Sequence, residues 1–534
     1  MGIVKDIREG LAGILKPSAE QSTEKAKAYK TSSALPAGAG WSLSYNGEKN
    51  SGELGPPINY LPNYAALRVR SWQSYTESEV TKTVIDRYVT WAVGTGLKLQ
   101  ASPNLKVLQT ENIEDFTKEG RNKFAAAVEA RFKIWSENTF STYSGNSSFS
   151  LDEGEAMKNT LIGGDVLVVM RLVKGVVKVQ LIDGQHIQTP LGLGVARNGN
   201  RIVNGVELDS KGAHTAYYVK RAALDYKRIQ SVGRKSKQKL AFMVYGSRYR
   251  IDSTRGMPLV SIVLETLKKL ERYKEATVGS AEERAKIVYQ IVHSEYSTGE
   301  SPLLKRLATA NDVDGSSPDG LPVDVSGNAM ARTVAVSTDK QTFNMAQGSE
   351  LKALESKVEI NFKDFYDTNF DIICAALGIP PNVARMLYDD NFSASRAALK
   401  DWENSLRVIR KKFSAQLNEP VYKFWLWSEI LSKKVQAKGY TNALAVGNEM
   451  AVAAYSSSRW IGSNVPHIDP LKEARAEREK LGPLGVNVPL TTPEKATENL
   501  GEGESTENFI RFSEELAAMD AVGLETEDEK SEGV

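Results

Sequence analysis

The chain has 534 residues, with 68 basic and 66 acidic side chains, a formal net charge of +2 and a single cysteine, Cys374. This length exceeds the size at which single hydrophobic cores stop growing, so several domains are expected. A chain that is basic throughout is excluded, as are an intrachain disulfide, a cysteine-rich zinc site and a CxxC redox pair. Cys374 itself lies in an apolar helical pattern, which predicts a packed small hydrophobe and not a nucleophile.

The N-terminal region combines a short amphipathic segment with a polar arm. Apolar residues recur at helical spacing before Pro17, namely Ile3, Val4, Ile7, Leu11, Ile14 and Leu15. They lack the continuous apolar stretch of a signal peptide, and we expect a docking segment. From Lys16 to about Leu61 the sequence is rich in Ser, Gly, Pro and Ala, which predicts a flexible arm or linker.

Two amphipathic helices are predicted in the region that follows. The first is capped by Ser78 and ends at Gly94 and Gly96, before a strand. The second spans residues 121–138. Its apolar positions share one face and are Phe124, Val128, Phe132 and Trp135.

The sequence pattern then changes from one typical of helices to one typical of strands. Residues 165–187 predict a hairpin that turns at Lys174 and Gly175, and further strands are expected at 215–221 and 239–250. The region from Leu61 to about Arg250 is therefore predicted to be α+β.

One long helix is predicted from Ser253 to Tyr289. Pro258 suits its first turn, because the missing N–H of proline costs nothing there. The apolar stripe consists of Leu259, Ile262, Val263, Leu267, Leu270 and Tyr273. The cations on the remaining surface predict a solvated face, and they are Lys268, Lys269, Arg272 and Lys274.

Past Tyr289 the sequence is dense in Gly, Pro, Ser and Asp, which predicts exposed loops with a short strand at 332–337. A helix resumes over residues 359–377, and a polar loop with Pro380 and Pro381 follows it. The next helix is cationic, with Arg396, Lys400, Arg407, Arg410, Lys411 and Lys412.

The C-terminal part is predicted to hold a turn anchored by Trp460 and a helix that opens after Asp469 and Pro470. The final segment carries many acidic and few basic residues. That composition predicts a disordered, solvating tail.

No catalytic constellation emerges from the sequence. The four histidines have no HxH or HExxH spacing, and there is no GxxxxGK[ST] phosphate loop. The adjacent Asp389 and Asp390 could hold a metal ion, but acids in a polar loop are more often solvated. We therefore predict no catalytic residue, no metal and no cofactor.

Six short motifs occur in a fixed order along the chain. They are LPN at Leu61, VGTGL at Val93, TRG at Thr254, LGIP at Leu377, FSASRAA at Phe392 and WIGS…ID at Trp460. In this order they resemble the lambda-like family of tailed-bacteriophage portal proteins, over roughly Leu61 to Gly485. Each motif alone is weak, and the specificity comes from the set.

The resemblance implies an α+β phage portal fold that assembles as a ring. The implied parts are a flexible N-terminal arm (1–40), an α+β wing (41–256), a stem helix (257–288), a loop-rich clip (289–348), a second stem helix (349–377), a tunnel loop (378–395), a long helix returning through the wing (396–445), a mostly helical crown (446–500) and an acidic C-terminal tail (501–534).

The resemblance also implies a function. A dodecameric ring at the unique capsid vertex of the virion, assembled in the host cytoplasm, would conduct double-stranded DNA during genome packaging and ejection. Implied partners are further copies of the chain, the terminase large subunit, the major capsid and scaffold proteins, and head-completion or adaptor proteins, with no membrane.

Site residues follow from the same resemblance. The tunnel loop and its return into helix would contribute Tyr388, Asn391, Phe392, Ser393 and Arg396, in steric and weakly electrostatic roles. Phe392 could instead pack the restarted helix, and Arg396 could pair with a neighbouring subunit. The clip would present Lys305, Arg306 and Arg332 to the packaging motor and head-completion proteins.

Two alternatives stay open at this point. One is a metal-dependent DNA-processing enzyme that uses Asp389 and Asp390. The other is a different virion structural or adaptor protein, which would lack catalytic groups equally well.

Overall fold

The computed structural model describes residues 44–45, 48–49, 63–111, 116–286 (apart from 223, 235, 249 and 252), 289–293, 349–353, 362–387, 392–463, 470–482, 490–500 and 505–522. The predicted arm at 1–40, the strand at 332–337 and most of the predicted clip lie outside these ranges. Contacts divide the chain into two units, residues 1–267 with 370–534, and residues 268–369. Within the described residues, no helix is long and apolar enough to cross a bilayer.

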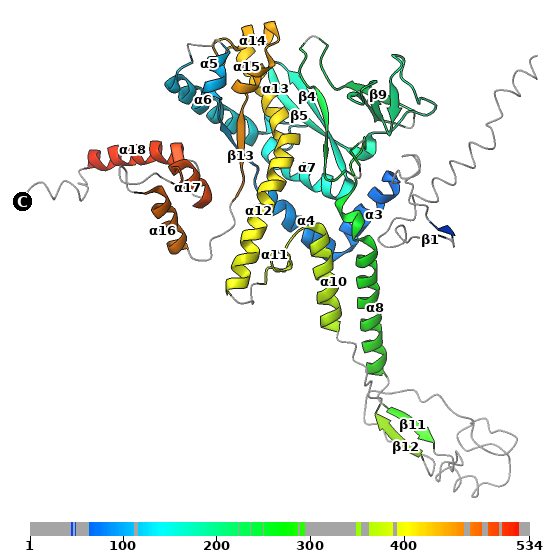
Figure 1. Cartoon of the computed structure of the whole chain (residues 1–534). Helices are drawn as coiled ribbons and strands as arrows, with labels where there is room; N and C mark the ends of the chain where they lie inside the picture. The colour runs from blue at the N-terminus through cyan, green and yellow to red at the C-terminus, as the bar shows by residue number, and fades with distance from the viewer. Residues whose placement is uncertain are drawn as a thin grey trace, which may run out of the picture. The chain divides into compact units, whose positions relative to one another are not determined.

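Helices of the first unit come from both ends of the sequence (Figure 1). The earlier ones are α3 (Tyr64–Glu77), α4 (Glu79–Ala92), α5 (Leu105–Thr110), α6 (Lys118–Glu137) and α7 (Phe149–Gly163). The later ones are α11 (Pro381–Arg385), α12 (Phe392–Gln416), α13 (Asn418–Leu431), α14 (Tyr440–Val446), α15 (Glu449–Tyr455), α16 (Pro470–Leu481), α17 (Pro493–Leu500) and α18 (Ser505–Val522). The two predicted amphipathic helices are confirmed as α4 and α6, although Ser78 occupies the N-cap of α4 without a side-chain cap hydrogen bond.

Two antiparallel sheets follow α7. The first has the order β10-β4-β5, from β4 (Asp165–Val173), β5 (Val176–Asp183) and β10 (Ala241–Tyr245). The second runs in chain order through β6 (Arg201–Val203), β7 (Val206–Leu208), β8 (His214–Lys220) and β9 (Tyr226–Gln230). The predicted hairpin is confirmed, and Lys174 and Gly175 have φ of 51° and 75°, as a two-residue turn with matching twist requires.

The two sheets share one hydrophobic cluster. Leu167 and Met243 from the first sheet are buried with Val206 and Tyr217 from the second. Because side chains alternate between the two faces of a strand, this cluster fixes which face of each sheet is internal.

The C-terminal half of the chain also packs against the early helices of the first unit. Phe132 of α6 makes edge contacts with Trp425 of α13 and with Trp460, at ring-centroid distances of 5.1 and 5.6 Å. Trp460 lies in β13 (Ser458–Ile461), which pairs with β3 (Lys98–Ala101), so the predicted Trp-anchored turn is wrong. A segment predicted as crown thus contributes a strand to the region predicted as wing.

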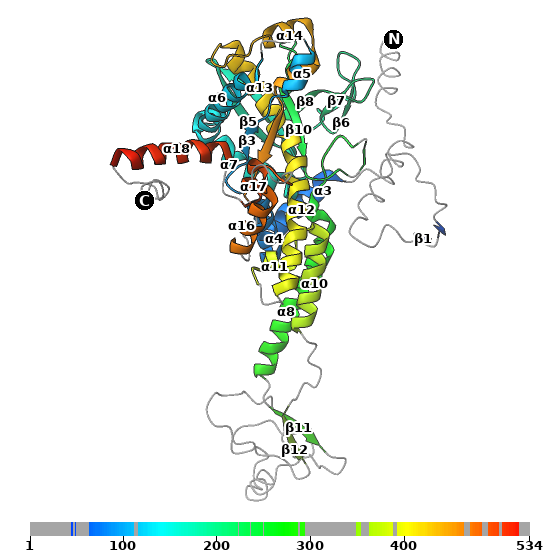
Figure 2. The same ribbon diagram turned by 60° about the vertical axis from the view of Figure 1, so that its left-hand side comes forward.

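The predicted single helix over 396–445 is also wrong. It is divided into α12, α13 and α14, with a break at Leu417 between the first two. Leu417 is fully buried, and α12 packs against β10 before the break (Figure 2).

The second unit contains most of α8 (Leu264–Lys286) and half of α10 (Phe362–Leu377), because the sequence boundaries between the units fall within these two helices. Within residues 268–369, the ring of Tyr273 stacks on Phe362 at 5.8 Å and contacts Phe365 at 4.1 Å. Strands β11 (Tyr289–His293) and β12 (Ser349–Ala353) pair antiparallel. The residues that flank segment 294–348, His293 and Ser349, are therefore paired.

Both predicted stem helices begin later than expected. The first, predicted over 257–288, begins at Leu264, because Pro258 has a non-helical ψ of 127° and leads into the short 3-10 helix η4 (Leu259–Ile262). The second, predicted over 349–377, begins at Phe362, because residues 349–353 pair as a strand with β11.

Asp165, at the start of β4, is fully buried between two arginines. Arg255 donates from Nε and Nη2 to the two carboxylate oxygens at 2.7 and 2.8 Å, and Arg68 donates from Nη2 at 2.9 Å. Gly256 donates its N–H to Asp165 Oδ2 at 2.8 Å, and a Cβ at Gly256 would lie 2.0 Å from the carbonyl oxygen of Gly164. The TRG motif is therefore a structural feature that joins α3 and β4 to the chain before α8.

The predicted disordered tail over 501–534 is wrong for residues 505–522. These form α18, because apolar residues recur there at helical spacing between the acidic ones. Residues 501–504 and 523–534 lie outside the described part. The predicted helix after Asp469 is confirmed as α16.

Candidate functional site

The segment from α10 to α12 contains the predicted tunnel loop. Helix α10 ends at Leu377, and Gly378 follows in the left-handed region with φ of 74°. The N–H of Ile379 bonds to the carbonyl of Cys374 at 3.1 Å, and that of Gly378 to the carbonyl of Ala375 at 3.2 Å. This is a glycine-ended helix terminus, which redirects the chain.

The short helix α11 follows at once, so the loop predicted over 378–395 is shorter than expected. Pro381 lies at its first position, where proline is favoured. Ile379, Val383 and Ala384 are buried, and α11 contacts α4. α11 ends at Met386, which has a left-handed conformation with φ of 59°.

Side chains from α4 and α10 hold the end of α11. The guanidinium of Arg385 lies over the ring of Phe370 at 4.2 Å and 3.4 Å from Asp371 Oδ1. Arg87 of α4 contacts the sulfur of Met386. These contacts fix the point at which the chain leaves α11.

Helix α12, on the far side of the loop, is anchored by its apolar face. Trp402, Leu406 and Phe413 are buried, and the Trp402 ring meets Tyr88 of α4 edge-on at 6.0 Å. Both α11 and α12 therefore contact α4, which makes α4 the shared support of the loop.

Arg410 of α12 caps the C-terminal end of α4. Its Nε donates to the carbonyl oxygen of Ala92 at 3.0 Å and its Nη2 to that of Trp91 at 2.8 Å, and it also contacts the carbonyl oxygen of Ser463. A Cβ at Gly462 would lie 2.6 Å from the Arg410 Nε, so glycine leaves room for this guanidinium. Burial lowers the pKa of Arg410.

The remaining described cations of α12 are all exposed, and two of them are paired with an acid. Lys400 and Arg407 both bind Glu403, at 2.7 and 2.6 Å. Although partial burial opposes it, these cations lower the pKa of the Glu403 carboxyl below its usual value. Lys411 and Lys412 are exposed. The cationic helix thus presents less free positive charge than its sequence suggests.

The structure leaves the predicted site residues only partly described. Tyr388 and Asn391 lie outside the described residues, as do Asp389 and Asp390 of the enzyme alternative. Phe392, Ser393 and Arg396 belong to the start of α12, and their side chains are not described.

The predicted clip residues Lys305, Arg306 and Arg332 also lie outside the described ranges. Sequence reasoning missed the cap formed by Arg410, since nothing local distinguishes this arginine from its cationic neighbours. By contrast, the helical spacing of Trp402, Leu406 and Phe413 in the sequence indicates the buried face of α12.

Cys374 is buried, and burial raises the pKa of its thiol to about 12, which keeps it protonated. The prediction of a packed small hydrophobe is confirmed. In the described part of the chain, no group of three or more His, Cys, Asp and Glu side chains is placed to hold a metal ion.

The comparison that decides the family is with a profile described as phage portal protein, lambda family, which matches residues 50–410. This match covers more than half of the chain. The chain belongs to the lambda family of phage portal proteins. The resemblance to this family is therefore confirmed, and five of the six motifs lie within the matched residues. The matched range includes α10, α11 and most of α12, so the segment described above is part of the portal family's own sequence.

The other comparisons give less information about this portal protein. No curated protein matches its sequence significantly. Among solved structures, a chain from the neck of an empty GTA particle computed with C6 symmetry has a TM-score of 0.44 and 10% identity, over 85% of this chain and 95% of that one. A chain from the neck of a native GTA particle computed with C12 symmetry has 0.33 and 12%, over 79% and 99%. A chain from the virion of a native gene transfer agent particle has 0.35 and 13%, over 79% and 99%.

Proposed function

We propose that this portal protein forms a dodecameric ring at the unique vertex of a phage capsid and conducts double-stranded DNA during packaging and ejection. The observation that carries the proposal is the family match over residues 50–410. In this role the chain is a passive structural component of the virion and has no enzymatic activity. A terminase large subunit then supplies the ATP-driven motor.

Helix geometry is compatible with such a conduit. Twelve helices side by side at a spacing of about 10 Å give a ring about 38 Å across its axes, which leaves about 28 Å between backbone surfaces. A DNA duplex about 20 Å wide passes with little clearance, so a loop that projects inward from each subunit touches it.

Weak electrostatics suits a conduit through which DNA must slide. A continuous polycationic lining would condense onto phosphates and slow translocation. In α12, Lys400 and Arg407 are paired with Glu403, and Arg410 is used as a helix cap. The net charge of the whole chain is only +2.

We assign the channel contact to the short segment between α11 and α12, with Tyr388 and Asn391, and to the start of α12, with Phe392, Ser393 and Arg396. This assignment is supported by the contacts that α11 and α12, the helices on either side of the segment, both make with α4. The wing, stem, clip and crown keep the order given by the resemblance, with the helix limits corrected above.

Docking of partners is assigned to the clip. What supports this is that β11 and β12, the strands on either side of residues 294–348, pair with each other. Lys305, Arg306 and Arg332 lie in that insertion and are proposed to face terminase and the head-completion or adaptor proteins. Capsid and scaffold proteins are proposed to surround the ring.

The channel assignment is tested by deleting residues Tyr388–Ser393. The control replaces the same six positions with Gly and Ser, which keeps the length and removes the side chains. Particles are imaged by negative-stain microscopy, and packaged DNA is measured in a terminase-driven assay. We expect intact rings and reduced packaging or retention for the deletion. Collapse of the rings would assign the loop to assembly, and unchanged packaging would exclude contact with moving DNA.

A further inference from the structure

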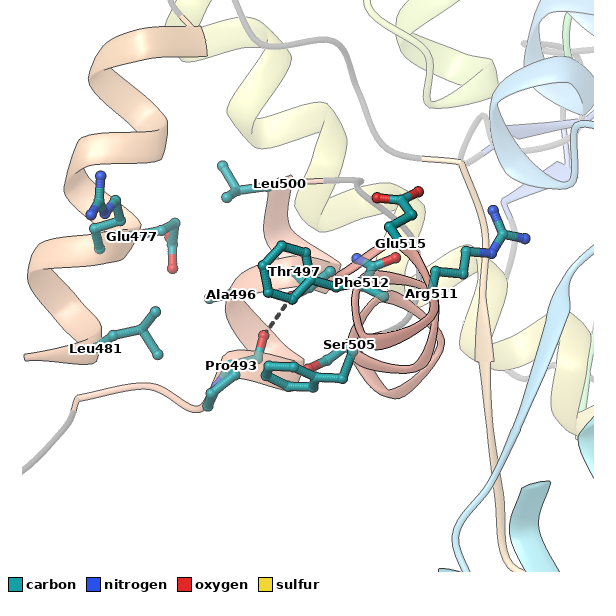
Figure 3. A pocket seen from close by; sticks show the side chains of 13 residues that line it. Glu477, Leu481, Pro493, Ala496, Thr497, Leu500, Ser505, Arg511, Phe512 and Glu515 are labelled. Atoms are coloured by element: carbon teal, nitrogen blue, oxygen red, sulfur yellow. Dashed lines mark hydrogen bonds between the residues drawn. The ribbon is translucent and has the colours of Figure 1, made fainter. Parts of the chain in front are cut away.

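A groove lies between three helices near the C-terminus, α16, α17 and α18 (Figure 3). Its volume is about 540 Å³, and its apolar lining includes Leu481, Ala496, Leu500, Phe509 and Phe512. In Figure 3 the side chains of Leu481 from α16 and Phe512 from α18 point toward α17. The groove plays no part in the proposed channel contact.

Helix α18 presents an apolar stripe that the described residues leave largely uncovered. Phe509, Phe512, Leu516 and Met519 are separated by three, four and three residues. Phe509, Phe512 and Met519 have exposed fractions of 64%, 60% and 39%. An exposed contiguous apolar surface marks an interaction site, and the 3.5-residue repeat is the pattern that pairs with another helix.

Charge argues against a second copy of α18 as that partner. Residues 505–522 contain four acidic residues (Glu507, Glu514, Glu515 and Asp520) and one basic residue (Arg511), a net charge of −3. Two copies of α18 packed along their apolar stripes would bring acidic side chains of both helices close together, which is unfavourable. A helix with the same apolar repeat and a cation beside it fits better.

The chain itself contains such a segment at its N-terminus. Val4, Ile7, Leu11 and Ile14 are also separated by three, four and three residues. Residues 3–15 contain Lys5 and Arg8 against Asp6 and Glu9, a net charge of zero compared with −3 for α18, and Arg8 directly follows Ile7 of the apolar repeat.

We propose that residues 3–15 dock as an amphipathic helix on the stripe of α18 and the adjoining groove. Gly10 and Gly13 each disfavour an isolated helix relative to alanine, so helix formation would depend on docking. The 47 residues from 16 to 62 can span up to about 150 Å, which is ample reach. The inference does not depend on DNA passage.

Disulfide trapping in the full-length protein tests the contact. Two double-cysteine variants are compared. In the seam pair, Leu11→Cys with Phe512→Cys, both positions belong to the apolar repeats; in the off-seam pair, Lys5→Cys with Glu514→Cys, neither does. The native Cys374 is buried and protonated, so it does not compete. We expect the seam pair to oxidise about tenfold faster, because docking raises the effective concentration of the thiols. A bond within one chain or between two copies supports the contact. Equal rates, or a predominance of Phe512→Cys homodimers, would overturn it.

Limited proteolysis gives a second readout that needs no oxidation. Trypsin cleaves after Lys5 and Arg8, and docking protects both bonds. Phe512→Glu is expected to raise the cleavage rate at these bonds about tenfold, whereas Ile510→Glu, an apolar-to-acidic change outside the stripe, leaves it unchanged. Circular dichroism establishes that each variant is folded. Equal cleavage in all three proteins would overturn the proposal.

Discussion

The Nε of Arg410 donates a hydrogen bond of 3.0 Å to the carbonyl oxygen of Ala92, the last residue of α4. The last four carbonyl groups of a helix have no partner within it, and a cation there also interacts favourably with the helix dipole. One side chain therefore ends α4 and attaches α12 to it. Since α4 also supports α11, this contact helps to set the geometry of the loop between them.

Arg410→Ala is expected to lower the free energy of unfolding by about 2–3 kcal/mol, because several hydrogen bonds from a charged donor are lost. The matched control is Lys411→Ala, which removes an exposed neighbour and should change stability by less than about 0.5 kcal/mol. Urea denaturation measures both. Equal effects of the two substitutions would show that the cap does not stabilise the fold.

Arg255→Ala is expected to cost about 3–5 kcal/mol, because Asp165 stays buried after losing one of its two cationic partners. Arg201→Ala, at an exposed position of β6, is the control and should be near neutral. The comparison uses denaturant midpoints of the two variants. A loss below about 1 kcal/mol would contradict a central structural role for the TRG motif.

Glu153 predicts a specific pH dependence. Burial raises the pKa of Glu153 to about 8, although a hydrogen bond of 2.8 Å from the Leu97 N–H opposes the shift. Above about pH 4.5 the unfolded chain releases this proton while the folded chain keeps it, so the free energy of unfolding falls as pH rises toward 8.

Glu153→Gln keeps an acceptor for Leu97 and removes the titration. We expect the variant to lose less stability than the original protein between pH 5 and pH 8, by about 1–4 kcal/mol. Denaturation at the two pH values, with identical ionic strength, measures the difference. Parallel pH profiles for the two proteins would show that Glu153 does not retain its proton in the fold.

Phe132→Ala is expected to cost about 3–5 kcal/mol, because it leaves a cavity in the aromatic cluster shared by α6, α13 and β13. Ile134→Ala removes an apolar side chain from the same helix at a position that is 62% exposed, and serves as the control. Thermal denaturation compares the melting temperatures of the two variants. Equal melting temperatures would show that the C-terminal half does not stabilise the first unit through this cluster.

Local signals in the sequence predicted the local elements well. The hairpin at Lys174 and Gly175 follows from alternating β-branched residues around a turn, and α6 follows from its apolar face. The family was also predictable, because short motifs in order carry information that no single stretch carries.

Elements that depend on distant partners were not predicted. Residues 349–353 form a strand only because residues 289–293 pair with them, and Trp460 lies in a strand because β3 offers an edge. At the candidate site, the helical turn after Pro381 and the role of Arg410 both depend on α4, which is far away in the sequence. The apolar stripe of α18 was not recognised, because the acidic composition of the C-terminal segment predicted disorder.

Single-particle electron microscopy of the assembled protein tests the central claim most directly. The proposed function predicts a closed ring of twelve subunits with an axial opening wider than a DNA duplex of about 20 Å, with the segment between α11 and α12 facing that opening. A protein that stays monomeric at all concentrations, or a particle whose axis is closed to a duplex in every state, would contradict it.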